Sequence, residues 1–349
     1  MNIQKPVVGI IGGGQLGSML AQAAKKINIK VIILSDDKDA PAYNYADQFI
    51  HSDYNDNLQI EKFVSLVDIV TFEFENIPFE VLNKISKIKK VLPLPKINQI
   101  VQDRRKEKSF VNDLGIKTTE WSFINSKEDI KNNKHLLPGI LKTCKLGYDG
   151  KGQYIISSVN DLHKISSGIT DCILEKIVNL KLEISVIITR FHNGECSIYE
   201  PIENNHQEQI LKYSKIPANI NQGIFYKAQS DAKLLAEKLD YVGTMCVEYF
   251  LTMENELLVN EIAPRVHNSG HLTINAFNIS QFENHIRAVC GLDNEKVIKI
   301  SDAEMINILG KEIEEYKGKS FKDNEFFFDY GKKAIKEKRK MGHLTTLNK

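Results

Sequence analysis

The chain has 349 residues, enough for two or three domains with buried cores, and its 42% hydrophobic and 26% charged residues are typical of a globular protein. A formal net charge of +1 argues against a nucleic-acid partner, and no apolar run approaches the roughly 20 residues that span a bilayer, which argues against a membrane protein. No secretory signal precedes the first apolar run, and five widely separated cysteines without a C-x-x-C pair fit reduced thiols, so we expect a cytoplasmic protein.

A glycine-rich loop follows the first predicted strand. Residues 7–11 (VVGII) form a short apolar run that is typical of a strand buried on both faces, and residues 12–17 follow with a G-x-G-x-x-G pattern. Apolar residues at helical spacing predict a helix from about Gln15, and residues 30–35 predict the next strand. The pattern matches the dinucleotide-binding fingerprint, and a glycine loop before a helix start can bind phosphate.

Strands and helices alternate through the rest of the first hundred residues. Residues 68–74 predict a strand, residues 77–85 a helix with Pro78 in its first turn, and residues 91–95 the end of the unit. This alternation predicts a parallel, doubly wound sheet, so we assign residues 1–97 to a Rossmann-like domain.

The remaining chain has a different order of predicted elements. A helix is predicted over residues 98–115, and strand-like runs with only short helices between them follow. A helix capped by Ser230 precedes a long predicted hairpin over residues 245–263. We therefore expect an α+β domain over residues 98–290 and a small C-terminal domain over residues 291–349.

A second glycine-rich loop, LGYDGKGQ at residues 146–153, follows the predicted strand that contains Lys142. Three glycines with an acid and a base between them suit a flap whose backbone amides close over phosphates. Taken alone, the loop fits a glycine-rich hairpin turn equally well. A strand lysine that leads into such a loop would place a positive charge beside a nucleotide phosphate, which favours phosphate binding.

Two carboxylates are predicted to face each other in the hairpin. If Glu254 and Asn255 form a two-residue turn, Glu248 pairs with Glu261, and directly opposed Cβ atoms lie about 4.5–5.5 Å apart. Two like charges at that separation need a shared proton or a cation, and Mg²⁺ is held by one or two carboxylates together with substrate phosphates. A turn one residue longer would spoil this register, and two solvated acids on an outer face remain the alternative.

The loop after the hairpin, IAPRVHNSGH at residues 262–271, is unusually polar. Arg265 could hold an anion or stabilise developing charge, and His267 could move a proton or donate a hydrogen bond near neutral pH. The alternative is a polar loop that only leads into the helix beginning near Ser280.

Together these motifs resemble the 5-(carboxyamino)imidazole ribonucleotide synthases of the ATP-grasp superfamily. The family's order is followed over nearly the whole chain by GIIGGGQLGSML, TFEFENIP, QDRRKEK, LKTCKLGYDGKGQ, EKIV, NEIAPRVHNSGH, SQFENHIRA and RKMGH. The resemblance implies an ATP-grasp fold that is preceded by a Rossmann-like parallel-sheet domain and followed by a small C-terminal domain.

The activity that the resemblance implies is an ADP-forming carbon–nitrogen ligation in de novo purine biosynthesis. ATP and bicarbonate give carboxyphosphate, and the amine of 5-aminoimidazole ribonucleotide then takes the carboxyl group as a carbamate and releases phosphate. The same resemblance implies Mg²⁺, with Mn²⁺ as a substitute, and a homodimer.

The resemblance also implies roles for individual residues. ATP would be bound by Arg104, Lys142, Gly147, Tyr148, Asp149, Gly150, Lys151, Gly152, Gln153, Glu175, Lys176, Ile177, Val178, Glu183, His206, Asn260 and Glu261. The catalytic groups around carboxyphosphate would be Tyr148, Asp149, Lys151, Arg265 and His267. The ribonucleotide would be held by Gln15, Leu16, Glu73, Asn268, Lys332, Arg339 and Lys340, and the metal by Glu248 and Glu261. The glycine loop at residues 12–17 is then left for the ribonucleotide's monophosphate.

Three alternatives stay open at this point. A nicotinamide-dependent oxidoreductase would explain the glycine pattern and the acids Asp36 and Asp37, which stand where a ribose-binding acid belongs, but it leaves the paired glutamates unexplained. A sister ATP-grasp enzyme, formate-dependent glycinamide ribonucleotide transformylase, would share ATP and purine intermediates but take a different acyl donor. A catalytically inactive binding protein is disfavoured because the expected charged residues are all present.

Overall fold

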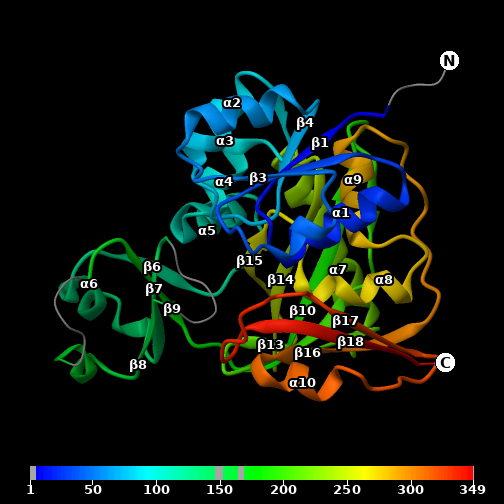
Figure 1. Ribbon diagram of the computed structural model, residues 1–349. Coiled ribbons are helices and arrows are strands. Elements are labelled where there is room, and N and C mark those ends of the chain that lie inside the picture. Colours follow the sequence, from blue (N-terminus) through cyan, green and yellow to red (C-terminus); the bar gives the residue numbers. More distant parts are fainter. Residues whose placement is uncertain (1–4, 146–151, 164–168, 349) are drawn as a thin grey trace.

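A five-stranded parallel sheet forms the first domain (Figure 1). The computed structural model describes residues 5–145, 152–163 and 169–348. The strands are β1 (Val8–Ile11), β2 (Val31–Ser35), β3 (Gln48–His51), β4 (Ile69–Phe72) and β5 (Lys90–Val91), in the spatial order β3-β2-β1-β4-β5. They are connected by α1 (Gln15–Lys26), the 3-10 turn η1 (Pro41–Asn44), α2 (Asn57–Ser65) and α3 (Phe79–Ser86). The predicted doubly wound parallel sheet is confirmed, with β3 and α2 as additions to the predicted elements.

The helix predicted over residues 98–115 is two helices, α4 (Pro95–Val101) and α5 (Arg104–Asp113). Asp103 accepts hydrogen bonds from the backbone amides of Arg105 and Lys106, so it caps α5 and interrupts the helical run. The single-helix prediction was therefore wrong, and Arg104 stands at the first position of α5.

A four-stranded antiparallel sheet forms a separate lobe at one side of the molecule (Figure 1). Its strands are β6 (Trp121–Ile124), β7 (Gly139–Thr143), β8 (Gln153–Ile156) and β9 (Cys172–Lys176), in the order β6-β9-β7-β8. The short elements of this lobe are α6 (Lys127–Asn132), η2 (Lys134–Leu136) and η3 (Val159–His163).

A nine-stranded antiparallel sheet forms the centre of the molecule. It contains β10 (Leu180–Arg190), β11 (Cys196–Ile198), β12 (Ile202–Gln207), β13 (Ile210–Ile216), β14 (Gly243–Thr252), β15 (Leu257–Ala263), β16 (Asp302–Leu309), β17 (Glu325–Asp329) and β18 (Lys340–Asn348). The order is β15-β14-β10-β12-β13-β16-β18-β17, and β11 pairs with β10. The last three strands thus continue the sheet of the preceding domain, and the 3-10 turn η5 (Gly310–Glu312) and helix α10 (Ile313–Tyr316) follow β16.

Helices cover both faces of the central strands. One face packs on α7 (Gln222–Lys238), and the other on η4 (Asn268–Leu272), α8 (Thr273–Ala276) and α9 (Gln281–Val289). Alternation along β14 explains this arrangement, because Met245 and Val247 join the core under α7 whereas Cys246 faces the other layer. Helix α9 also packs against α1, which joins the first domain to the central sheet.

Helix α7 starts eight residues before the predicted cap. Asn221 accepts a hydrogen bond from the amide of Ile224 and is the N-cap, so the assignment of Ser230 as the cap was wrong.

Among the described residues, no helix is both long and apolar enough to cross a bilayer.

Candidate active site

Glu248 and Glu261 are directly opposed across β14 and β15, as predicted, although the predicted turn was wrong. The turn has three residues: the carbonyl of Glu256 accepts from the amide of Thr252, and Leu251 pairs with Leu257. This extra residue alone would shift the register and separate the two glutamates. A β-bulge at Asn260 adds one residue on β15, which shifts the register back and places Glu248 opposite Glu261.

The two glutamates have different surroundings. The side chain of Glu248 is 14% exposed, whereas that of Glu261 is 40% exposed and lies 3.6 Å from Nη1 of Arg104. Burial, together with the charge of Glu261, raises the pKa of Glu248 to about 8. A third carboxylate, Glu107 on α5, accepts from the amide of Ile262 at 2.6 Å, and burial and the Glu261 charge raise its pKa to about 8. The site therefore brings three carboxyl groups together, and a cation bound there would favour their ionised form.

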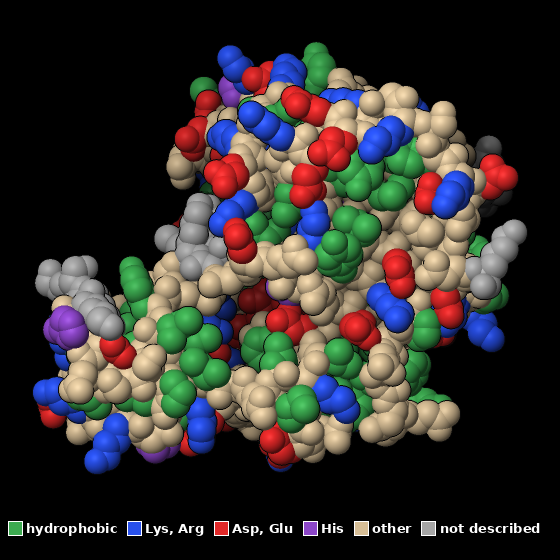
Figure 2. Space-filling model, turned by 90° about the horizontal axis from the view of Figure 1, so that it is seen from below, with side chains coloured by type: hydrophobic (Ala, Val, Ile, Leu, Met, Phe, Trp, Pro, Cys, Tyr) green, Lys and Arg blue, Asp and Glu red, His purple; other side chains and the backbone are tan. Residues whose placement is uncertain are grey.

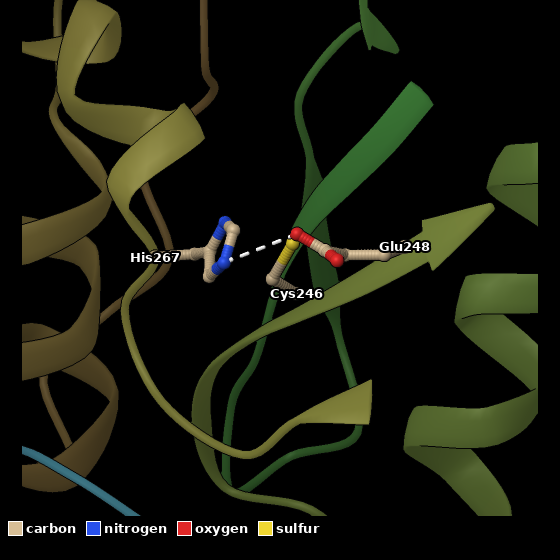
Figure 3. A group of neighbouring side chains, drawn as sticks. All are labelled: Cys246, Glu248 and His267. Carbon is tan, nitrogen blue, oxygen red and sulfur yellow. Dashed lines mark ion pairs between the residues drawn. The ribbon is translucent and has the colours of Figure 1, made fainter. Parts of the chain in front are cut away.

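His267 approaches Glu248 from the loop after β15 (Figure 3). Burial and the nearby Arg265 and Lys340 charges lower the pKa of His267 well below its usual value, so the ring is neutral. The amide of Ser269 donates to Nδ1 at 3.3 Å, which makes Nδ1 an acceptor and puts the proton on Nε2. Nε2 lies 3.2 Å from Oε1 of Glu248, and the contact is a hydrogen bond donated by neutral imidazole.

A buried row of polar side chains holds the His267 ring. The Ser269 hydroxyl lies 2.9 Å from Nδ1 of His267 and 2.8 Å from the hydroxyl of Ser185 on β10. Asn204 on β12 donates to Ser185 and accepts from Ser214 on β13, both at 2.9 Å. The row crosses three strands and fixes the imidazole against the carboxylate pair.

Arg265 is paired with a residue that the sequence analysis missed. Its Nη2 donates to Oε1 of Glu75 at 2.9 Å, and its Nε donates to the other carboxylate oxygen. Burial works to raise the pKa of Glu75, but the guanidinium outweighs it and the pKa lies below the usual value. Arg265 therefore joins the loop to the first domain and retains its positive charge within the site.

Lys142 lies in a buried ion-pair group on the four-stranded lobe. Its ammonium is 2.7 Å from Oε2 of Glu175 on β9, and Lys108 on α5 is 3.1 Å from Oε1 of the same carboxylate. Burial works to raise the pKa of Glu175, and the two lysines overcome it and lower the pKa to about 2. Burial lowers the pKa of Lys142 despite this partner. The group carries net positive charge, which suits a phosphate.

The other residues predicted to bind the nucleotide lie on β9, β10 and β12 and in the connection after β9. Glu183 on β10 and His206 on β12 form an ion pair; burial opposes the rise, but the Glu183 contact raises the pKa of His206. The amides of Lys176 and Ile177 already donate to the carbonyls of Glu120 and Pro138, so these two amides are used within the protein. Val178 follows them directly in the connection between β9 and β10.

The glycine loop at residues 12–17 binds a carboxylate of the protein itself. Glu73, just after β4, accepts from the amide of Gly17 at 2.5 Å and from the amide of Gly14. These are amides that a dinucleotide pyrophosphate would use, and Glu73 already occupies them. The loop therefore disfavours a nicotinamide cofactor despite its fingerprint.

The basic tail returns to this loop. Lys332 donates to Oε1 of Gln15 at 2.6 Å and to the carbonyl of Lys340 at 2.7 Å. The side chain of Leu16 packs against the apolar core beneath α1, so only the backbone of this residue can contact a ligand at the helix start. Arg339 donates to the carbonyl of Ala334 within the tail.

Asn268 is a buried amide whose Oδ1 and Nδ2 both lack a hydrogen-bond partner among the described residues. Buried polar groups without partners are rare in folded proteins, so this side chain is suited to hydrogen-bond a ligand or a water molecule.

The predicted flap residues Gly147, Tyr148, Asp149, Gly150 and Lys151 lie outside the described residues. At the end of that loop, the carbonyl of Gly152 accepts from Thr143, and Gln153 pairs with Lys142 in the sheet.

Figure 2 shows the molecular surface hollowed between the four-stranded lobe and the central sheet, with acidic and basic side chains gathered in the hollow. The charged members of the site that were absent from the predicted set are Glu75, Glu107 and Lys108. Glu107 and Lys108 follow Arg104 at helical spacing of three and four residues in QDRRKEK, a signal that could have placed them on the same face of a helix.

Models of three protein families match the chain. Residues 6–102 match the ribonucleotide synthetase preATP-grasp domain, residues 109–282 the ATP-grasp domain, and residues 303–349 the phosphoribosylaminoimidazole carboxylase C-terminal domain. N5-carboxyaminoimidazole ribonucleotide synthase of Bacillus subtilis is 41% identical over 345 residues, which cover 97% of this chain and 90% of the relative.

Solved structures agree with this similarity. N5-carboxyaminoimidazole synthetase from Staphylococcus aureus in complex with ADP superposes with a TM-score of 0.92 at 35% identity, over 98% of this chain and 93% of that one. The synthase from Aspergillus clavatus in complex with ADP and 5-aminoimidazole ribonucleotide gives a TM-score of 0.90 at 27% identity, over 99% and 94% of the two chains. By its sequence and its fold, the chain belongs to the N5-carboxyaminoimidazole ribonucleotide synthase family of ATP-grasp proteins.

Proposed function

We propose that this protein catalyses the ATP- and bicarbonate-dependent carboxylation of 5-aminoimidazole ribonucleotide to its 5-carboxyamino product through carboxyphosphate. The observation that carries the proposal is the opposed Glu248 and Glu261 pair, and we assign the phosphates of the two substrates to groups on the two other sheets. Lys142 supplies positive charge from the four-stranded lobe, and the loop at residues 12–17 lies at the start of α1 in the first domain. Two phosphorylated substrates need two phosphate sites, whereas a protein that binds a single nucleotide would need only one phosphate site.

Mg²⁺ fits the donor set at the carboxylate pair. The two side chains are both hard oxygen donors, and they stand directly opposite each other across β14 and β15. We infer that Glu248 and Glu261 hold the ion, with Asn260 at the adjoining bulge. When bound, Mg²⁺ would neutralise charge on the ATP phosphates.

The protein's own groups have distinct proposed tasks. Arg104 and Lys142 orient the ATP phosphates, and Arg265, anchored by Glu75, keeps a fixed positive charge near the carboxyphosphate oxygens. Neutral His267 holds Glu248 in place through its N–H at Nε2, and the unpartnered amide of Asn268 can bind the ribonucleotide. A closed site would protect carboxyphosphate from water.

The direct test is coupled ADP release. We expect ATP hydrolysis with Mg²⁺ to require both 5-aminoimidazole ribonucleotide and bicarbonate. Stimulation by glycinamide ribonucleotide with formate, and none by aminoimidazole ribonucleotide, would move the assignment to the sister enzyme. Titration with NAD(H) should give no binding signal, because Glu73 already uses the amides of Gly14 and Gly17.

The monophosphate is proposed to bind the first-turn amides of Gln15 and Leu16, with Lys332 beside them. The first amides of a helix have no partner within the helix, and Lys332 reaches the side chain of Gln15 at 2.6 Å. Lys332→Met should therefore raise the KM for 5-aminoimidazole ribonucleotide by about tenfold or more, since hydrogen bonds to charged groups contribute about 1.5–3 kcal/mol.

The neighbouring Lys333→Met is the matched control. Lys333 pairs with Asp39 on the surface and its side chain is 73% exposed, so its loss should leave both KM values unchanged. Equal effects of the two substitutions, or an increase in the KM for ATP alone, would contradict the placement of the monophosphate.

We also propose a cytoplasmic homodimer. Each of the five cysteines is a free thiol in the structure, which supports a reducing compartment, and the homodimer rests on the family resemblance. Sedimentation equilibrium of the full chain measures the oligomeric state directly.

A further inference from the structure

A thiol lies beside the proposed magnesium ligands. Cys246 and Glu248 are two residues apart on β14 and so face the same side of the sheet, where His267 meets them from the following loop (Figure 3). One ligand atom from each residue, the Cys246 Sγ, a Glu248 carboxylate oxygen and a His267 ring nitrogen, lies within 4.8 Å of the other two. Across the described parts of the chain, this is the one group of three such side chains that converges in this way.

The three donors do not match Mg²⁺. Magnesium takes oxygen ligands in octahedral geometry, whereas sulfur, imidazole and carboxylate together are the ligand set of zinc-class cations. We propose that Cys246, Glu248 and His267 form an inhibitory site for a thiophilic divalent cation such as Zn²⁺, which removes Glu248 from the proposed magnesium site. The inhibition rests on the proposed function, but binding of the cation does not.

The surroundings supply what a bound histidine needs. A cation on Nε2 moves the proton of His267 to Nδ1, so Nδ1 gives up the hydrogen bond that it accepts from the Ser269 amide and donates instead to the Ser269 hydroxyl, which lies 2.9 Å away. The Ser269 side chain also hydrogen-bonds the thiol of Cys246. One hydroxyl thus orients two of the three ligands, and Ser185 holds it from the other side at 2.8 Å.

Access and charge are also consistent with the site. The side chains of Glu248 and His267 are 14% and 12% exposed, so a cation can enter past them, whereas Cys246 forms the buried floor. Binding replaces the thiol proton: the Zn–S bond forms, the S–H bond breaks, and the proton leaves to solvent. Three protein ligands leave a fourth position for water, as in other zinc sites of this ligand number.

The binding test uses Co²⁺ as a spectroscopic probe on the full chain without nucleotide. We expect a thiolate-to-cobalt charge-transfer band that saturates near one equivalent, that is lost in Cys246→Ala, and that persists in the control Cys196→Ala. Cys196 lies on β11 and is one of two partly exposed thiols, so it reports any adventitious binding to another cysteine. No band in the wild type, or an undiminished band in Cys246→Ala, would overturn the proposal.

The inhibition test measures ADP release at fixed Mg²⁺ with increasing Zn²⁺, relative to each variant's own zinc-free rate. Cys246→Ala should need about tenfold or more Zn²⁺ for half inhibition, the lower end of the loss that perturbed metal sites show. Added Mg²⁺ should relieve the inhibition of the wild type, because the two ions compete for Glu248. Identical zinc sensitivity of both proteins would overturn the inhibitory role.

A failure of the proposed function can be distinguished from a failure of the proposed cation site. A charge-transfer band in a protein without the expected turnover would refute the proposed function and leave the cation site standing. If circular dichroism shows that Cys246→Ala is unfolded, Cys246→Ser keeps the size of the side chain and must lose the sulfur band in the same way.

Discussion

Replacing Glu248 or Glu261 by glutamine is expected to abolish turnover without loss of stability. The proposed magnesium ion stabilises charge on the transferring phosphoryl group by several kcal/mol, so the loss of one ligand should lower kcat by about 10³-fold or more. For Glu248→Gln, stability should be unchanged or slightly raised, because the neutral amide avoids both the burial of a charge and the repulsion by Glu261, which together raise the pKa of Glu248 to about 8. Coupled ADP release measures the first effect and urea unfolding at pH 7 the second.

The hairpin offers its own control for this experiment. Glu256 lies beside the turn of the same hairpin and pairs at the surface with Lys117, with 52% of its side chain exposed. Glu256→Gln should retain full activity. A Glu248→Gln or Glu261→Gln variant with wild-type turnover would refute the metal assignment, and a strongly destabilised variant would refute the account of their repulsion.

The same hairpin illustrates how far the sequence could predict the site. The opposition of Glu248 and Glu261 was predicted from a two-residue turn, and the pairing is confirmed although the turn is longer. Two departures cancel: the longer turn shifts the register by one residue, and the bulge at Asn260 shifts it back. Neither departure has a clear signature in the sequence, because bulges depend on how the strand packs rather than on residue type alone.

Regular elements were predictable where burial follows a simple period. The unit from β1 to β2 was predicted within one residue because its strands are buried on both faces and α1 has one apolar side. Strand β3 was missed because it has only four residues, of which two are polar and exposed and only one is buried. The break between α4 and α5 was missed because Asp103 acts as a cap inside a run that otherwise has helical spacing.

Contacts across the molecule were the least predictable part of the site. Arg265 is 190 residues from its partner Glu75, and Lys332 is 317 residues from Gln15. Periodicity and capping act over a few residues, so neither indicates which distant charges meet. The family resemblance implied which residues would contact the ligands, but it did not imply Glu75, Glu107 and Lys108, which contact other groups of the protein.

Replacing Glu175 by glutamine is expected to have the largest effect on stability. The carboxylate lies between the ammonium groups of Lys108 and Lys142, at 3.1 and 2.7 Å, and all three side chains are less than a tenth exposed. Glutamine has nearly the same shape but no charge, so it leaves two buried lysines without a counter-ion. Breaking a buried pair in this way costs about 3–5 kcal/mol in the free energy of unfolding. Urea unfolding at pH 7 measures the change.

The pH dependence and a surface pair separate this effect from a general loss of stability. The Lys108 and Lys142 charges, acting against burial, lower the pKa of Glu175 from 4.5 to about 2, so its contribution is complete above about pH 4.5 and is lost as the pH falls towards 2. The difference between wild type and Glu175→Gln should therefore shrink over that range. Glu256→Gln, which breaks the exposed pair with Lys117, should cost less than about 1 kcal/mol at every pH. A cost for Glu175→Gln as small as that of Glu256→Gln would show that the buried carboxylate does not hold the two lysines in place.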